Sequence, residues 1–325
     1  MPTQGISRIK PAALQPGDTI AIVAPASNIK RELLETGLLQ LEKLGYTTVY
    51  LDSILEQDLY FAGSVDRRVR ELEEMFARPD VRAVVCARGG YGTNYLLGKL
   101  DIGKMARHPK IFVGYSDITT LLTAFTDIGG FVTFHGPMAA RDFAESGGVD
   151  LESWQNALTA VDTWELNVGA NSGVQPLVEG KAEGILYGGC LSMLVASLGT
   201  PYEIRTQGTI LFVEDVATKP FQVDRMLMHL KLASKLDGVR GIVFGEMLDC
   251  QQAAGQGYTL QEVILRVTRE LGIPVAYGLR SGHVSRGNIT LPLGVRVALT
   301  VEATKVTMKF LEAATAPVAI PARNP

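Results

Sequence analysis

The sequence has 325 residues, enough for two domains, and its 46% hydrophobic and 20% charged residues are typical of a folded globular protein. A formal net charge of −3, with acidic and basic residues mixed along the chain, excludes the basic surface that would bind nucleic acid or an anionic membrane. Neither is therefore expected as a partner.

The first 150 residues alternate between short apolar runs and amphipathic segments. Strands are predicted at 19–24, 47–51, 82–87 and 111–115, and helices at 28–45, 64–77 and 93–100. Strands separated by helices predict a doubly wound, mostly parallel sheet with helices on both faces. In such sheets ligands bind at the carboxyl ends of the strands.

The pattern weakens beyond residue 150. The polar, glycine-containing segment 167–173 predicts a linker over 151–182, between a domain at 1–150 and a domain at 183–325. The second domain is expected to contain strands at 209–213 and 241–244, helices at 222–234 and 259–271, and closing strands at 289–291, 295–301 and 305–311. The last two are expected to form a hairpin. The fold class is therefore α/β: an N-terminal doubly wound domain and a C-terminal α/β domain with a β-rich end.

The cysteines, the N-terminal residues and the length of the apolar runs indicate the cellular compartment. Cys86, Cys190 and Cys250 are odd in number and far apart, which favours reduced thiols. The first residues lack the apolar core of a signal peptide, and no apolar run is long enough to span a bilayer. We expect a cytoplasmic protein. No metal-ligand spacing is present, so neither a metal nor a cofactor is expected.

The segment VGYSDITT (113–120) joins an apolar run to the expected start of a helix. At such a corner Ser116 would project from the top of the sheet like the nucleophile of a strand–turn–helix elbow, and the free amide of Asp117 could bind a developing oxyanion. Ile118 stands where the second glycine of G-x-S-x-G would be. Taken alone, the segment is better explained by a serine that caps the helix.

The segment RGGYG (88–92) directly follows the third predicted strand. Glycines there let the backbone approach a ligand closely, and their amides can surround an anion. The segment has neither the spacing of a dinucleotide site nor that of a P-loop. A turn that needs positive φ explains it equally well.

A serine nucleophile needs a histidine base, and the chain has four histidines. We assign His108 and His229 to the surface or to packing. His135 and His283 both lie in glycine-marked loops after apolar runs, and local sequence does not choose between them.

The orienting acid must be a carboxylate in a structured place. Glu214 and Asp215 follow an apolar run, and because adjacent strand residues point in opposite directions, only one of them is expected to face a site. Glu246 is a weaker alternative, and solvated loop charges are the competing interpretation.

Several motifs occur in chain order: ARGGYGTNYLL (87–97), VGYSDITTLL (113–122), TFHGPM (133–138), GGCLSMLVASLGTPYE (188–203), ILFVEDV (210–216), FQVDRMLMHLKLA (221–233) and GHVSRGNITLPLG (282–294). Together they resemble the serine LD-carboxypeptidases, which trim muropeptides and include the microcin C self-immunity peptidases. The resemblance extends over nearly the whole chain. It implies an active site between an N-terminal domain with the serine and a C-terminal domain with the acid and base.

The resemblance also implies the roles of individual residues. Ser116, Glu214 and His283 would form the catalytic triad, and the amides of Gly90 and Asp117 would form the oxyanion hole. His135 would be a structural or supporting residue. The implied activity is release of terminal D-alanine from murein tetrapeptides in peptidoglycan recycling, by a homodimer that needs no cofactor.

Other assignments stay open at the level of sequence. Arg88 is a candidate for binding the substrate carboxylate, with a salt bridge inside the fold as the alternative. Cys190 stands where the family pattern has asparagine, and Lys219 lies in a segment where a more acidic one is expected. A peptidase acting on peptidyl-nucleotides is one alternative function, and a non-catalytic protein that binds phosphate with the RGGYG loop is another.

Overall fold

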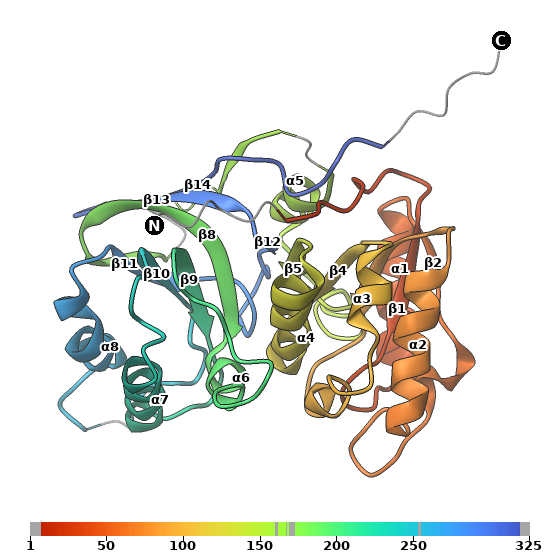
Figure 1. The fold of residues 1–325 in the computed structure, drawn as a ribbon, viewed down its shortest axis with the longest axis horizontal. Coiled ribbons are helices and arrows are strands. Elements are labelled where there is room, and N and C mark those ends of the chain that lie inside the picture. The colour runs from red at the N-terminus through yellow and green to blue at the C-terminus, as the bar shows by residue number, and fades with distance from the viewer. Residues whose placement is uncertain (1–7, 160–161, 167, 169–172, 253–254, 319–325) are drawn as a thin grey trace.

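The computed structural model describes residues 8–159, 162–166, 168, 173–252 and 255–318. Two sheets lie side by side, one built mainly from the N-terminal half of the chain and the other from the C-terminal half (Figure 1). This arrangement confirms the predicted mixed α/β fold class.

The first sheet has six strands in the order β12-β5-β4-β3-β1-β2. Its strands are β1 (Thr19–Val23), β2 (Thr47–Val49), β3 (Val81–Cys86), β4 (Ile111–Gly114), β5 (Thr133–His135) and β12 (Leu291–Leu293). All the neighbours pair in parallel except β12, which pairs antiparallel with β5. The central strands are buried on both faces, which is why they read as uninterrupted apolar runs.

Helices cover this sheet. They are α1 (Arg31–Lys43), α2 (Val65–Ala77), α3 (Ile102–Ala106), α4 (Thr119–Ala124) and α5 (Leu151–Thr159). The helix predicted at 93–100 is wrong beyond its first residues, since only a 3₁₀ turn forms over Thr93–Tyr95. Two hydrogen bonds from Thr93 to Asp117 hold this segment against the 3₁₀ turn that precedes α4 instead.

The second sheet has eight strands in the order β6-β14-β13-β8-β9-β10-β11-β7. Its strands are β6 (Trp164–Leu166), β7 (Gln175–Val178), β8 (Gly180–Cys190), β9 (Thr209–Glu214), β10 (Gly241–Gly245), β11 (Val275–Leu279), β13 (Arg296–Glu302) and β14 (Lys305–Phe310). The four strands β8 to β11 run parallel, and the flanking strands are antiparallel. Helices α6 (Leu191–Ala196), α7 (Pro220–Leu232) and α8 (Leu260–Thr268) complete the lobe.

The range predicted as a linker, 151–182, contains α5, β6, β7 and the start of β8. The short strands β6 and β7 lie at the two edges of the second sheet and carry polar residues, so no apolar run identified them. The predicted hairpin is present, with β13 paired to β14 from Val297 to Glu302.

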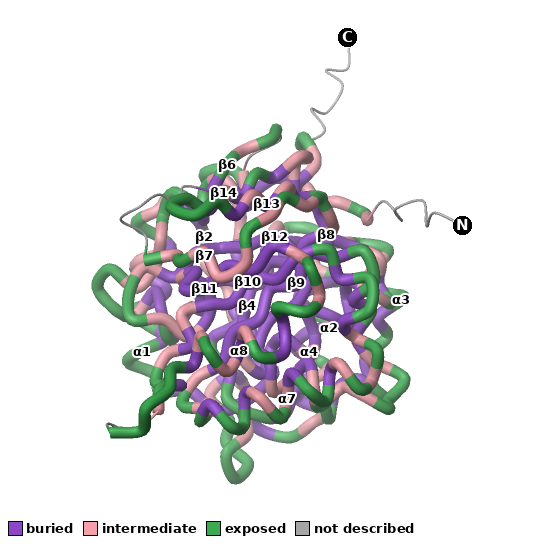
Figure 2. The backbone as a smooth tube through the Cα atoms, turned by 90° about the vertical axis from the view of Figure 1, so that its left-hand side faces the viewer, coloured by how far each residue is buried: buried purple, intermediate pink, exposed green. Residues whose placement is uncertain are grey.

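The larger of two hydrophobic clusters among the described residues spans both lobes, and the smaller lies within the second lobe. The main cluster joins first-sheet residues such as Phe112 and Phe134 to second-sheet residues such as Phe212 and Val243. Figure 2 shows buried backbone running through β4, β9 and β10 at the centre of the molecule. A shared core fixes the lobes relative to each other, which matters for a site built from both.

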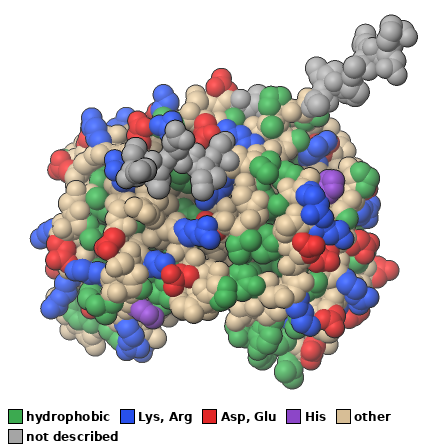
Figure 3. Space-filling model, viewed as in Figure 1, with side chains coloured by type: hydrophobic (Ala, Val, Ile, Leu, Met, Phe, Trp, Pro, Cys, Tyr) green, Lys and Arg blue, Asp and Glu red, His purple; other side chains and the backbone are tan. Residues whose placement is uncertain are grey.

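The surface agrees with the charge composition. On the face seen in Figure 3, basic and acidic side chains are interspersed. Within the described ranges, no helix combines the length and hydropathy that a membrane span requires.

Candidate active site

Ser116 occupies a strained turn between β4 and α4. Its φ of 64° is in the left-handed region, which costs a non-glycine residue about 1–3 kcal/mol. Gly114 permits the turn, because a Cβ there would lie 2.8 Å from Ile118 Cγ2. Ser116 is half-buried, and within the described part of the chain its hydroxyl has no hydrogen-bond partner. The hydroxyl does not cap the helix and is therefore available to a ligand.

The RGGYG loop lies directly against this serine. A Cβ on Gly89 would be 2.8 Å from Ser116 Cβ and 3.0 Å from its Oγ. The loop is held by Ser27, whose Oγ accepts a hydrogen bond of 3.1 Å from the Tyr91 amide. Gly90 has φ 107°, and a Cβ there would clash with Ser27 Oγ at 2.3 Å. The glycines therefore allow both the turn and the close approach to Ser116.

Asp117 has a structural side chain. It is 2% exposed, and its carboxylate accepts a hydrogen bond of 2.9 Å from the Thr93 amide. Thr93 also donates its hydroxyl to the Asp117 carbonyl at 2.7 Å. Since Asp117 is in the first turn after Ser116, its own amide has no partner within the helix. The residue thus ties the turn to the 93–95 segment and leaves an amide beside the serine.

Glu214, at the carboxyl end of β9, forms a hydrogen-bonded pair with the half-buried His283. Glu214 is fully buried, and its Oε2 accepts bonds of 2.7 Å from His283 Nδ1 and 3.0 Å from the His283 amide. A Cβ on Gly282 would lie 2.5 Å from Glu214 Cδ, so this approach depends on the glycine. With Nδ1 donating to the carboxylate, Nε2 of a neutral His283 is free to accept a proton.

Glu214 and His283 each shift the pKa of the other toward the charged form. Burial alone would raise the pKa of Glu214, but His283 and His135 outweigh it and hold that pKa at about 2. Burial also lowers the pKa of His283, but the adjacent Glu214 carboxylate raises it above its ordinary 6.5. Glu214 is therefore ionised across the physiological range.

A chain of contacts links this pair to the serine turn. The His283 ring packs edge-on against Tyr115, the residue before Ser116, with ring centroids 5.1 Å apart. Tyr115 donates its hydroxyl to Asp142, and Asn288 bonds both Asp142 and the Gly282 amide. No direct hydrogen bond joins Ser116 to His283 in the described structure, as is common before substrate binds.

The other sequence candidates lie outside this arrangement. Asp215 accepts bonds from Ser192 and Val216 amides, as expected if it faces away from Glu214. Glu246 accepts a bond from the Ser285 amide, and among the described residues no hydrogen bond or ion pair joins it to His283. Arg88 is exposed and donates to the Asn28 carbonyl at 3.3 Å. Among the described residues no salt bridge to Arg88 is found, and its binding role stays a prediction.

Asp142 and Asn288 were not singled out from sequence. Asn288 lies inside the GHVSRGNITLPLG motif, so the motif could have pointed to it. Asp142 lies in an irregular segment where no spacing pattern marks it. Cys190 pairs in register with Glu214, and its amide bonds Thr119 Oγ1 at 3.0 Å. The unexpected cysteine is therefore a buried neighbour of the site, while Lys219 is exposed.

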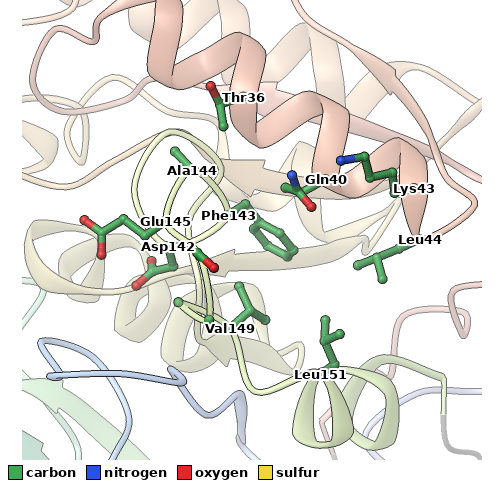
Figure 4. A pocket seen from close by; sticks show the side chains of 13 residues that line it. Thr36, Gln40, Lys43, Leu44, Asp142, Phe143, Ala144, Glu145, Val149 and Leu151 are labelled. Atoms are coloured by element: carbon green, nitrogen blue, oxygen red, sulfur yellow. The ribbon is translucent and has the colours of Figure 1, made fainter.

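A pocket of about 440 Å³ lies between α1 and the 142–149 segment (Figure 4). Gln40, Lys43, Phe143 and Val149 are among its lining residues. Neither Ser116 nor the Glu214–His283 pair lines it. The site is therefore defined by the hydrogen-bonded residues above and not by this pocket.

The structure thus places a strained serine turn near a hydrogen-bonded glutamate–histidine pair. The sequence matches the LD-carboxypeptidase N-terminal domain over residues 20–136 and the LD-carboxypeptidase C-terminal domain over 183–299. The chain belongs to the LD-carboxypeptidase family and is a peptidase.

Three relatives illustrate the match. A probable murein peptide carboxypeptidase of Bacillus subtilis is 40% identical over 91% of this chain and 93% of its own length. The microcin C7 self-immunity protein MccF of Escherichia coli is 30% identical over 89% of this chain and 92% of its own. The crystal structure of muramoyltetrapeptide carboxypeptidase from Oxalobacter formigenes has a TM-score of 0.81 and 31% identity, covering 92% of this chain and 100% of the other.

Proposed function

We propose that this protein is a serine LD-carboxypeptidase that releases terminal D-alanine from murein tetrapeptides. The hydrogen-bonded Glu214–His283 pair beside the strained Ser116 turn is the observation that carries the proposal. The relatives named for murein peptides support the substrate class. A cytoplasmic homodimer acting in peptidoglycan recycling completes the proposal.

The proposed reaction is an acyl transfer. His283 Nε2 takes the proton of Ser116 Oγ, which attacks the carbonyl of the bond between an L-centre and the terminal D-residue. The amides of Gly90 and Asp117 receive the oxyanion, each worth about 3–4 kcal/mol. His283 then protonates the leaving amine, and water hydrolyses the acyl-enzyme. Glu214 holds the imidazole in the required tautomer throughout.

The mechanism predicts the acid side of the pH profile. A protonated His283 cannot accept the serine proton, so kcat/KM should fall as the pH drops through the pKa of His283. Because Glu214 raises that pKa above 6.5, the acid limb is expected above pH 6.5. Initial rates of tetrapeptide cleavage across pH would locate it. An acid limb centred below 6.5 would contradict the proposed pairing.

Arg88 is expected to bind the terminal carboxylate of the substrate. It is exposed, adjoins Gly89 beside Ser116, and has no carboxylate partner among the described residues. Charged hydrogen bonds are worth about 1.5–3 kcal/mol, so Arg88→Ala should lower kcat/KM for the tetrapeptide by roughly 10- to 100-fold.

A tetrapeptide with an amidated C-terminus is the matched control for Arg88. Wild type and Arg88→Ala should cleave it at similar rates, because the carboxylate is absent from both reactions. An equal loss on both substrates would show that Arg88 acts on the fold or the loop instead.

The function is tested by digesting two tetrapeptides that differ only in the configuration of the terminal alanine. Mass spectrometry should show loss of alanine from the isomer ending in D-alanine and none from the all-L isomer. An untouched D-alanine tetrapeptide at micromolar enzyme would overturn the proposed substrate.

The relationship to a microcin self-immunity protein supports a second candidate with the same chemistry. A peptidyl-nucleotide conjugate tested beside the tetrapeptide separates the two by their kcat/KM values.

Binding of inorganic phosphate without turnover of either substrate would favour the non-catalytic alternative, in which the RGGYG loop holds an anion. Analytical ultracentrifugation tests the homodimer.

A further inference from the structure

Glu214 has a second histidine on the side opposite His283. His135, at the end of β5, is fully buried, and its Nε2 lies 3.8 Å from Glu214 Oε1. His283 uses only Oε2 of the carboxylate. Each oxygen of Glu214 therefore faces a different histidine.

The contacts of Ser281 determine where one proton of His135 lies. Ser281 Oγ is 2.8 Å from the Ile289 carbonyl, which only accepts hydrogen bonds, so the single hydroxyl proton of Ser281 is donated there. His135 Nδ1 lies 2.9 Å from the same Ser281 oxygen. With its own proton already committed, Ser281 must accept this bond. His135 Nδ1 therefore carries a hydrogen.

The opposite ring nitrogen has no partner at hydrogen-bond distance. His135 Nε2 and Glu214 Oε1 are both buried and both without a hydrogen bond among the described residues. If Nε2 lacked a hydrogen, its lone pair would face a carboxylate oxygen in a fully buried place. Two buried acceptors that face each other repel, whereas a protonated Nε2 would attract the carboxylate oxygen across the 3.8 Å between them.

The catalytic cycle adds an argument from charge. His283 must be neutral before it can accept the serine proton, so at that stage it offers Glu214 no positive charge. A buried carboxylate without a cation is costly. His135 is the other basic side chain within 4.0 Å of the Glu214 carboxylate in the described structure.

We infer that His135 is a positioning residue, doubly protonated in the resting enzyme, that holds Glu214 at Oε1 while the carboxylate holds His283 at Oε2. This inference rests on the proposed function only through the role of His283. The positive charge of His135 offsets the Glu214 carboxylate and so limits how far that carboxylate raises the pKa of His283. The His135 ring otherwise faces Phe212 and Tyr115, and the hydroxyl of Tyr115 is bonded to Asp142.

His135→Gln tests the charge, because glutamine keeps an N–H donor but is neutral. Without the second cation, Glu214 raises the pKa of His283 further. The acid limb of kcat/KM should therefore move to higher pH by about one unit. His229→Gln, at an exposed histidine of α7, is the matched control and should leave the limb in place. An acid limb that does not move in His135→Gln would overturn the inference, since loss of packing alone lowers the plateau without shifting the limb.

A second measurement needs neither a variant nor activity. Neutron diffraction from wild-type crystals grown near neutral pH should show deuterium on both Nδ1 and Nε2 of His135. Deuterium on only one of these nitrogens would overturn the inference, even if His135→Gln does not fold. Because this result is independent of turnover, its failure can be distinguished from failure of the proposed function, which inactivity towards the D-alanine tetrapeptide would reveal.

Discussion

Ser116→Ala is expected to lower kcat for release of D-alanine by roughly 10⁴- to 10⁶-fold, because the members of a serine triad act as a unit. KM should change little, since the hydroxyl forms its critical bond only during the reaction. The rate is measured by quantifying free D-alanine under saturating tetrapeptide. Retention of more than about one hundredth of the wild-type kcat would show that Ser116 is not the nucleophile.

The same position should reveal the conformational strain of the turn. Ser116 has φ 64°, which alanine adopts no more readily than serine, whereas glycine adopts it freely. Ser116→Gly should therefore be more stable than Ser116→Ala by about 1 kcal/mol in denaturant unfolding, although both are inactive. Equal stability of the two variants would mean that the turn stores no strain at this residue.

Glu214→Gln is expected to lower kcat by roughly 10³- to 10⁴-fold with little change in KM. Glutamine fits the space, but it cannot stabilise the imidazolium that forms when His283 takes the serine proton. Two donors of His283 converge on Oε2, and an amide that presents its NH₂ group there would repel both. Steady-state kinetics measure the loss.

The pH dependence of stability supplies a second readout for this carboxylate. The pKa of Glu214 is held at about 2, below its ordinary 4.5. Its ionised form therefore contributes stability that is present above pH 4.5 and lost as the pH falls through 2. Glu214→Gln should lack this component in acid unfolding.

Glu246→Gln is the control, because Glu246 is a partly exposed acid at the next strand end and, in the described structure, has no hydrogen bond or ion pair to His283. It should stay within a few-fold of wild type in kcat. Equal losses in the two variants would contradict the assignment of Glu214 as the orienting acid.

The sequence predicted those parts of the molecule whose physical cause is local. The buried parallel strands β1, β3 and β4 are continuous apolar runs, because both faces of the sheet are covered. The corner at Ser116 could be recognised because a strand meets a helix there. The positive φ of Ser116 could not be recognised from the sequence, because Ile118 replaces the glycine that usually marks such a turn.

Contacts between distant segments were not predictable from local pattern. Strand β12 crosses into the first sheet and pairs with β5, which brings residue 291 beside His135. The bonds of His135 to Ser281 and of Asn288 to Asp142 each span 146 residues. No spacing rule connects such pairs, because they meet only after both sheets have formed. For the same reason, the roles proposed for Glu214 and His283 rest on a family resemblance and not on local sequence pattern.

A crystal structure of Ser116→Ala with a bound D-alanine tetrapeptide would test the central claim most directly. We predict that the carbonyl oxygen of the L-to-D bond accepts hydrogen bonds from the Gly90 and Asp117 amides. His283, still bonded to Glu214, should direct Nε2 toward position 116, about 3 Å from where the serine oxygen would be. A scissile carbonyl bound away from position 116, or a His283 ring turned away from it, would contradict the account.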